Sequence, residues 1–176
     1  MPTRQPVPRL WLMTDERLGD GLLDAVGRLP DGAGIVFRHY SLPQDERRAL
    51  FDRVGEAARR RGLLLLLAGP AELGRAWGAD GSHGRGPGAG LRSAPAHDLA
   101  ELRAAEEASA DLVFVSPVFA TLSHPEARPL GVAGFARLAG ATRLPVIALG
   151  GMSAGRAGAL EAAGAHGWAG ISAWRD

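Results

Sequence analysis

The chain has 176 residues, of which 46% are hydrophobic, so it can form one packed domain and is not a disordered chain. Its 20 basic and 19 acidic residues leave a formal net charge of +1, which argues against a nucleic-acid or membrane partner. All of the basic residues are arginine, and cysteine is absent as well as lysine. This composition excludes a Schiff-base lysine, a thiolate metal site and a disulfide framework.

The start of the chain, Met1–Arg9, carries no apolar leader segment. The longest apolar run, Leu63–Ala68, is too short to cross a bilayer. We therefore expect a cytoplasmic protein that forms a single domain over residues 1–176.

Short apolar runs alternate with helical patterns along the whole chain. The expected strands are Leu10–Thr14, Gly34–Arg38, Leu63–Leu67, Gly81–His83, Leu91–Ala94, Leu112–Val115, Pro145–Leu149 and Gly167–Ser172. The expected helices are Leu22–Leu29, Pro43–Arg61, Pro70–Trp77, Asp98–Ser109, Gly131–Ala139 and Ser153–Ala163. A strand-then-helix rhythm predicts a parallel sheet, and eight such units predict an α/β fold of the (β/α)8 TIM-barrel type. A doubly wound open sheet is the alternative.

Two helices of the full barrel pattern are missing. The segment Gly84–Gly90 is too rich in glycine to hold a helix, and the chain stops at Asp176 directly after the last strand. We therefore expect a trimmed barrel in which the fourth and the C-terminal helix are reduced or absent. Without these helices, apolar surface beside the strands would be exposed, and a second copy of the chain could cover it. We therefore expect a possible homodimer.

Ligands of parallel barrels bind at the carboxyl ends of the strands, and the strongest local signal lies at the last two. The seventh strand runs into Gly150 and Gly151 and then into a helix, while the eighth ends at Ile171 and Ser172. Glycines let backbone N–H groups approach an anion closely, and a helix start adds a partial positive charge. These bends predict a phosphate site, although the two glycines could also form only a tight turn.

Further candidates follow other strands. Arg38 is suited to a second phosphate or a pyrophosphate if it faces the barrel mouth, and to a surface ion pair if it does not. The loop Ser116–Pro125 contains the hydroxyl residues Thr121 and Ser123 together with His124, and could either cover a ligand or merely connect two elements.

Several histidines fall at expected strand ends. They are His39, His83, His97 and His124. No pair has the spacing of metal ligands, and few acidic residues accompany them, so we expect no metal site. His97 or His124 could act as a general acid and base, although a lone histidine is more often structural.

Taken in order, these segments resemble the thiamine phosphate synthase/TenI superfamily over nearly the whole chain. The matching segments are Leu12–Asp15, Gly34–Tyr40, Trp77–His83, Ser116–His124, Pro129–Gly131, Pro145–Met152 and Gly170–Ala173. The resemblance implies a thiamine-biosynthesis barrel that binds a thiazole phosphate. It further implies that Arg38 contacts a pyrophosphate, that Thr121 and Ser123 line the loop over it, with His124 at the loop's lysine position, and that Gly151, Ile171 and Ser172 hold the thiazole phosphate.

The sequence departs from the synthases where they bind Mg²⁺. Their Asn-Asp pair after the third strand is Ala68 and Gly69 here, and their second aspartate falls in Gly84–Gly90, which has no carboxylate. We therefore expect no bound cofactor, with Mg²⁺ entering only on a substrate pyrophosphate, and no efficient synthase reaction.

TenI-type members also lack the metal-binding pair, and they act as thiazole tautomerases through a histidine at the position that matches His97. The resemblance therefore implies His97 as the catalytic residue of a proton transfer that requires no metal. A non-catalytic barrel that binds or senses a phosphorylated metabolite is the alternative function, and another phosphate-sugar barrel enzyme is a third.

Overall fold

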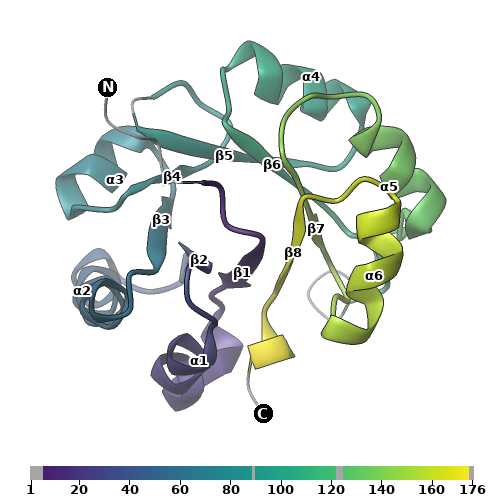
Figure 1. Cartoon of the computed structure of the whole chain (residues 1–176). Helices are drawn as coiled ribbons and strands as arrows, with labels where there is room; N and C mark the ends of the chain where they lie inside the picture. Colours follow the sequence, from purple (N-terminus) through teal and green to yellow (C-terminus); the bar gives the residue numbers. More distant parts are fainter. Residues whose placement is uncertain (1–5, 89, 122–124, 175–176) are drawn as a thin grey trace.

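The structure of the chain is a computed structural model that describes residues 6–88, 90–121 and 125–174. Its strands form a closed parallel barrel in chain order, from β1 to β8 and back to β1, with the helices outside (Figure 1). The strands are β1 Leu10–Met13, β2 Gly34–Phe37, β3 Leu64–Ala68, β4 Gly81–His83, β5 Leu91–Ala96, β6 Leu112–Val115, β7 Val146–Leu149 and β8 Gly167–Gly170. The barrel prediction is confirmed, and the alternative of an open sheet is wrong.

The helices follow the strands as predicted. They are α1 Leu22–Arg28, α2 Gln44–Arg60, α3 Ala71–Trp77, α4 Leu99–Glu107, α5 Gly131–Ala139 and α6 Ala154–Ala162. Two short 3-10 helices, η1 at Glu16–Gly21 and η2 at Ser172–Trp174, were not predicted. Both follow a strand at the carboxyl end of the barrel, where they add to the ring of loops above it.

The interior of the barrel is filled by side chains. Trp11 is fully buried there, and its indole lies edge-on to Phe114 with 5.3 Å between the ring centroids. The indole fits only because the neighbouring strand has glycine at position 34. A Cβ atom on Gly34 would lie 2.3 Å from the Trp11 ring. The barrel is therefore closed by packing in its middle, and a ligand must bind at its end.

The glycine-rich segment and Arg92 take the place of the fourth helix. Arg92 lies on β5 with only 5% of its surface exposed. Its Nη2 donates to the carbonyl oxygen of Gly86 at 2.6 Å, and its Nη1 donates to the carbonyl oxygens of Ala108 and Ser109 after α4. Gly88 packs so closely on α3 that a Cβ atom there would lie 2.1 Å from the Cβ of Ala71. One arginine thus fastens the segment that replaces a helix.

After β8 the described chain forms η2, whose tryptophan packs back on the barrel. Trp174 of η2 stacks on Trp168 of β8, with ring centroids 5.2 Å apart and planes 7° from parallel. Its Nε1 donates to the carbonyl oxygen of Trp11 at 3.3 Å. The trimmed form of the barrel is as predicted, and these contacts show how its outer surface is covered without the helix.

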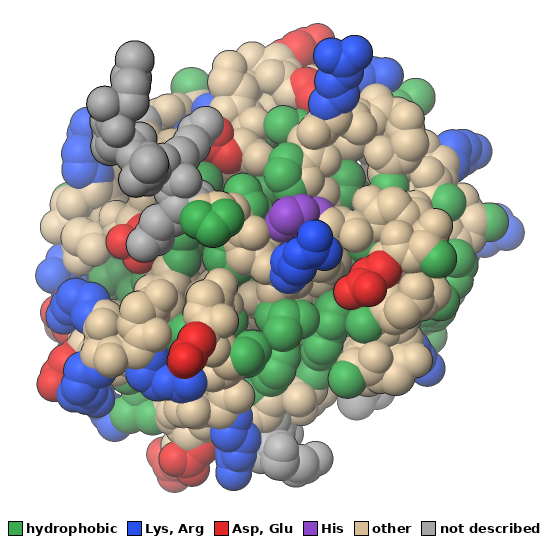
Figure 2. Space-filling model, viewed as in Figure 1, with side chains coloured by type: hydrophobic (Ala, Val, Ile, Leu, Met, Phe, Trp, Pro, Cys, Tyr) green, Lys and Arg blue, Asp and Glu red, His purple; other side chains and the backbone are tan. Residues whose placement is uncertain are grey.

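The homodimer stays a prediction, but its original reason is weakened. The exposed large hydrophobic side chains among the described residues are Tyr40, Leu99 and Val132, and they belong to three different segments. On the face shown in Figure 2, arginine and acidic side chains are interspersed. No helix in the described part of the chain is long and apolar enough to span a bilayer.

Replacing Arg92 should test how the trimmed barrel is held together. Arg92→Met removes the buried guanidinium that donates to the carbonyl oxygens of Gly86, Ala108 and Ser109, and we expect the free energy of unfolding to fall by about 1.5 to 3 kcal/mol. Arg85→Met is the matched control, because Arg85 in the same segment forms an exposed ion pair with Glu101. Exposed pairs contribute less than about 1 kcal/mol. Equal losses in the two variants, measured by urea denaturation, would contradict this role of Arg92.

Candidate functional site

A cavity of about 520 Å³ opens at the carboxyl ends of the strands. Seven of the residues predicted from the sequence line it: Arg38, His97, Thr121, Gly150, Gly151, Ile171 and Ser172. The other two, Ser123 and His124, lie outside the described residues. No aspartate or glutamate is among the described residues that line the cavity. The structure therefore gathers residues from β2, β5, the β6–α5 loop, β7 and β8 around a space without acidic walls.

The two glycines after β7 are required by both conformation and packing. Gly150 and Gly151 have φ angles of +97° and +61°. A Cβ atom on Gly151 would lie 2.6 Å from the carbonyl oxygen of Ala120, and one on Gly150 would lie 2.8 Å from the Cα of Pro117. The tight turn is therefore real. It also presses the β6–α5 loop against the end of β7, which brings Thr121 to the same cavity.

Backbone donors are available on both sides of this end of the cavity. Within the part of the chain that the structure describes, no protein acceptor takes the backbone N–H of Gly151, Ile171 or Ser172. Such groups are satisfied by water or by an anionic ligand. This arrangement can hold a phosphate without any charged side chain at the two bends.

Arg38 is fixed at the end of β2, in another part of the mouth. Its Nε donates to the carbonyl oxygen of Thr14 at 2.8 Å, and its Nη2 donates to Asp15 at 2.9 Å. Arg17 binds the same carboxylate at 2.6 Å. The hydrogen bond from Arg17 is the main reason that the pKa of Asp15 is lowered. Two arginines thus share one carboxylate. With Arg47 bonded to the Arg38 carbonyl oxygen and Glu16 close to both arginines, three positive charges here face two negative ones.

His97 is held in one tautomer. Its Nδ1 lies 2.8 Å from the carbonyl oxygen of Ser116, and its backbone N–H donates to Glu101 at 2.9 Å. A carbonyl oxygen can only accept, so the proton must sit on Nδ1. The other ring nitrogen, Nε2, then carries a lone pair. The position can therefore act as a base, as predicted for a catalytic histidine, but its role remains a prediction.

Two other histidines differ from each other in their surroundings. His39 is buried and stacks on Phe37, its Nδ1 lies 3.0 Å from Thr14 Oγ1, and it does not line the cavity. Its role is structural. His83 does line the cavity, and its Nδ1 lies 2.8 Å from Ser93 Oγ. His83 could not be preferred over the other histidines from the sequence, because its partner Ser93 belongs to a neighbouring strand.

The residues at the mouth do not fit a Mg²⁺ site. Among the described residues there is no group of three or more histidines, cysteines or acidic residues that could hold a metal ion. At the end of β3, the guanidinium of Arg47 donates to the carbonyl oxygen of Ala68 at 2.7 Å. Asp15 is paired with two arginines, and Glu16 accepts hydrogen bonds from Ser41. A cation is already present where a second one would have to bind.

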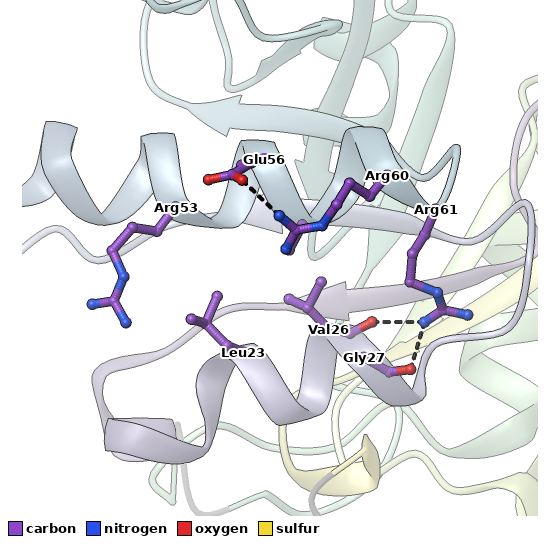
Figure 3. A pocket seen from close by; sticks show the side chains of 8 residues that line it. Leu23, Val26, Gly27, Arg53, Glu56, Arg60 and Arg61 are labelled. Carbon is purple, nitrogen blue, oxygen red and sulfur yellow. Dashed lines mark hydrogen bonds and ion pairs between the residues drawn. The ribbon is translucent and has the colours of Figure 1, made fainter.

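A second cavity, of about 280 Å³, lies between α1 and α2 on the outside of the barrel (Figure 3). There Arg61 donates to the carbonyl oxygens of Val26 and Gly27, at 3.0 and 2.6 Å, and so satisfies the end of α1. Glu56 is paired with Arg60 at 2.6 Å. These charges stabilise helices, and the cavity is remote from the strand ends where ligands of barrels bind.

The burial of His83 predicts a dependence of stability on pH. Burial, with a smaller contribution from the charge of Arg38, lowers the pKa of His83 to about 4. The unfolded chain then binds more protons than the folded chain between about pH 6.5 and about pH 4, so stability falls as the pH falls through this window.

We expect His83 to account for a loss of about 2 kcal/mol between about pH 7.5 and about pH 5. Burial also lowers the pKa of His39, so His39 should likewise reduce the free energy of unfolding as the pH falls. His83→Gln should flatten the pH dependence by the contribution of His83, as measured by urea denaturation at both pH values. An unchanged slope in the variant would show that His83 is not buried as a neutral ring.

Comparison with known proteins supports the architecture and names the family. The family model for thiamine monophosphate synthase matches residues 93–174. A thiamine-phosphate synthase of Laribacter hongkongensis is 32% identical over 189 residues, which cover 93% of this chain and 86% of that protein. The bifunctional protein ThiM/ThiE of Symbiobacterium thermophilum is 39% identical over 153 residues, but this chain spans only 32% of its length.

A solved structure with the same fold is the thiamine phosphate pyrophosphorylase of Pyrococcus furiosus. It superposes with a TM-score of 0.77 at 22% identity, over 93% of this chain and 85% of that one. The chain thus belongs to the thiamine phosphate synthase/TenI superfamily.

Proposed function

We propose that the cavity at the barrel mouth binds a thiazole phosphate and that His97 interconverts tautomers of its ring by proton transfer. The observation that carries this proposal is the tautomer of His97, whose Nδ1 is tied to the carbonyl oxygen of Ser116 so that Nε2 is left as a base at the cavity. No metal is needed for such a reaction.

The phosphate end of the ligand is assigned to the two backbone bends. The free N–H groups of Gly151, Ile171 and Ser172 would donate to phosphate oxygens, and the Ser172 hydroxyl would add a further donor. The three arginines near β1 and β2 (Arg17, Arg38 and Arg47), which outnumber the carboxylates Asp15 and Glu16, favour an anionic ligand as a whole. Thr121 lies in the loop beside this space and would contact the ligand from above.

Proton transfer by His97 conserves protons overall. Nε2 would take a proton from one ring atom of the ligand and return it to another, while Nδ1 stays hydrogen-bonded to Ser116. The imidazolium formed in between is stabilised by the same carbonyl oxygen, and its charge is offset by Glu101, which contacts the His97 backbone.

The synthase reaction is less well supported. Departure of a pyrophosphate develops negative charge that Mg²⁺ normally offsets, and the cavity has no carboxylates to hold the ion. Mg²⁺ could then enter only as a complex with the substrate. The same lack of carboxylates favours the second candidate function, a barrel that binds or senses a phosphorylated metabolite without converting it.

His97→Ala should remove the tautomerase activity while leaving ligand binding in place. We expect the rate of exchange between the thiazole tautomers, followed by NMR in deuterated water, to fall by about 10² to 10⁴-fold. His166→Gln is the control, because His166 lies at the amino end of the barrel, where its Nε2 contacts the carbonyl oxygen of Val7. A wild-type protein that binds thiazole phosphate but exchanges no protons would favour the non-catalytic binder.

The phosphate site is tested by charge at position 172. Ser172 is exposed, so Ser172→Asp should fold normally while placing a carboxylate beside the phosphate. We expect it to weaken binding of thiazole phosphate at least about tenfold, since like charges repel at short range. Ser172→Ala, which removes only the hydroxyl, should weaken it by a few-fold at most. Calorimetric titration of both variants measures this, and equal affinities would place the phosphate elsewhere.

A further inference from the structure

His83 is a buried histidine in the cavity that the proposed proton transfer does not use. It ends β4, and only 7% of its surface is exposed. It lines the same cavity as Arg38 and His97, yet it lies deeper than His97, whose side of the rim is exposed. A neutral polar ring at this depth is costly unless it is hydrogen-bonded, so its partners indicate what it does.

The imidazole of His83 is held from two sides. Its Nδ1 lies 2.8 Å from Ser93 Oγ, and Ser93 is the residue paired with His83 in the register between β4 and β5. The ring also stands edge-on to Phe114, with centroids 5.3 Å apart and planes at 90°. These contacts fix the ring plane and turn the opposite nitrogen, Nε2, away from Ser93.

Nε2 of His83 opens into the cavity. Among the described residues, every buried side-chain nitrogen and oxygen atom has a hydrogen-bond partner, and the partner found for His83 is at Nδ1. Nε2 must therefore be accessible, and the accessible space next to His83 is the cavity. The atom is available to a ligand.

Ser93 allows Nε2 of His83 to act either as a hydrogen-bond donor or as an acceptor. The Ser93 hydroxyl lies between two acceptors, His83 Nδ1 at 2.8 Å and the carbonyl oxygen of Ser82 at 3.5 Å. When the hydroxyl donates to Ser82, Nδ1 carries the ring proton and Nε2 accepts. When the hydroxyl turns to Nδ1, the ring proton sits on Nε2, which then donates. Both forms are uncharged and have the same number of protons.

We propose that His83 is a specificity-determining residue, which uses Nε2 to hydrogen-bond the uncharged heterocyclic end of the ligand while Ser93 selects its tautomer. This rests on the proposed function, which places the phosphate at the other end of the cavity. The ring nitrogen of a thiazole ligand has a lone pair and accepts a hydrogen bond. Binding of such a ligand therefore favours the His83 tautomer in which Nε2 carries the proton and donates. The ligand class is a phosphate ester of a nitrogen heterocycle.

Burial and the positive charge of Arg38 support this assignment, because they keep the pKa of His83 low and the ring neutral. A neutral ring does not attract the phosphate, so it cannot compete with the two backbone bends for that end of the ligand. The ligand is thereby oriented with its ring toward His83.

Calorimetry with two probes, thiazole phosphate and inorganic phosphate, tests the assignment. Wild-type protein should bind thiazole phosphate more tightly. His83→Phe should weaken the binding of thiazole phosphate about tenfold, because one hydrogen bond is lost. The affinity for inorganic phosphate should stay unchanged. His83→Gln, whose amide both donates and accepts, should recover most of the loss. Ser93→Ala should give a smaller loss of about threefold, and His166→Gln should match wild type.

Nitrogen-15 NMR of the histidine rings reports the tautomer of His83, which ligand binding would not change if His83 had only a structural role. Thiazole phosphate should shift the proton of His83 from Nδ1 to Nε2, and inorganic phosphate should not. Equal affinity of wild type and His83→Phe for thiazole phosphate, with no tautomer change, would overturn the role of His83 and leave the phosphate site intact. Failure of wild type to bind either probe would overturn both.

Discussion

The pairing of β8 with β1 is the contact on which the site depends. Trp11 pairs with Ala169, and the N–H of Trp168 donates to the carbonyl oxygen of Arg9 at 2.8 Å. The backbones approach so closely that a Cβ atom on Gly167 would lie 1.8 Å from that oxygen. Only glycine permits the ring to close there. Closure brings the bends after β7 and β8 to the same cavity as Arg38, although these residues are more than a hundred positions apart in the sequence.

The cavity differs from a metal-assisted phosphate site in how its charge is arranged. At one end, backbone N–H groups of Gly151, Ile171 and Ser172 are available to a ligand. Around Arg38, three arginines (Arg17, Arg38 and Arg47) face the two carboxylates Asp15 and Glu16. The two described histidines that line the cavity both have Nδ1 engaged by an oxygen atom, from Ser116 or from Ser93, which leaves Nε2 for the proposed ligand. This arrangement suits binding and proton transfer of a heterocycle better than departure of a pyrophosphate.

Much of the fold could be predicted because its strands are buried on both faces and read as unbroken apolar runs, such as Leu64–Ala68. Gly150 and Gly151 could be recognised because a glycine pair between a strand and a helix has few structural uses. The role proposed for His83 could not be predicted, since it depends on Ser93 across a strand register that the sequence does not display. The covering roles of Arg92 and Trp174 were hidden for the same reason: their partners are distant in the chain.

A crystal structure of the protein with thiazole phosphate is the most direct test of the proposed site. We expect the phosphate within hydrogen-bond distance of the backbone nitrogens of Gly151 and Ser172, with the ring between His97 and His83. A phosphate bound at the outer cavity between α1 and α2, or held by Arg38 with the two bends left free, would contradict this proposal.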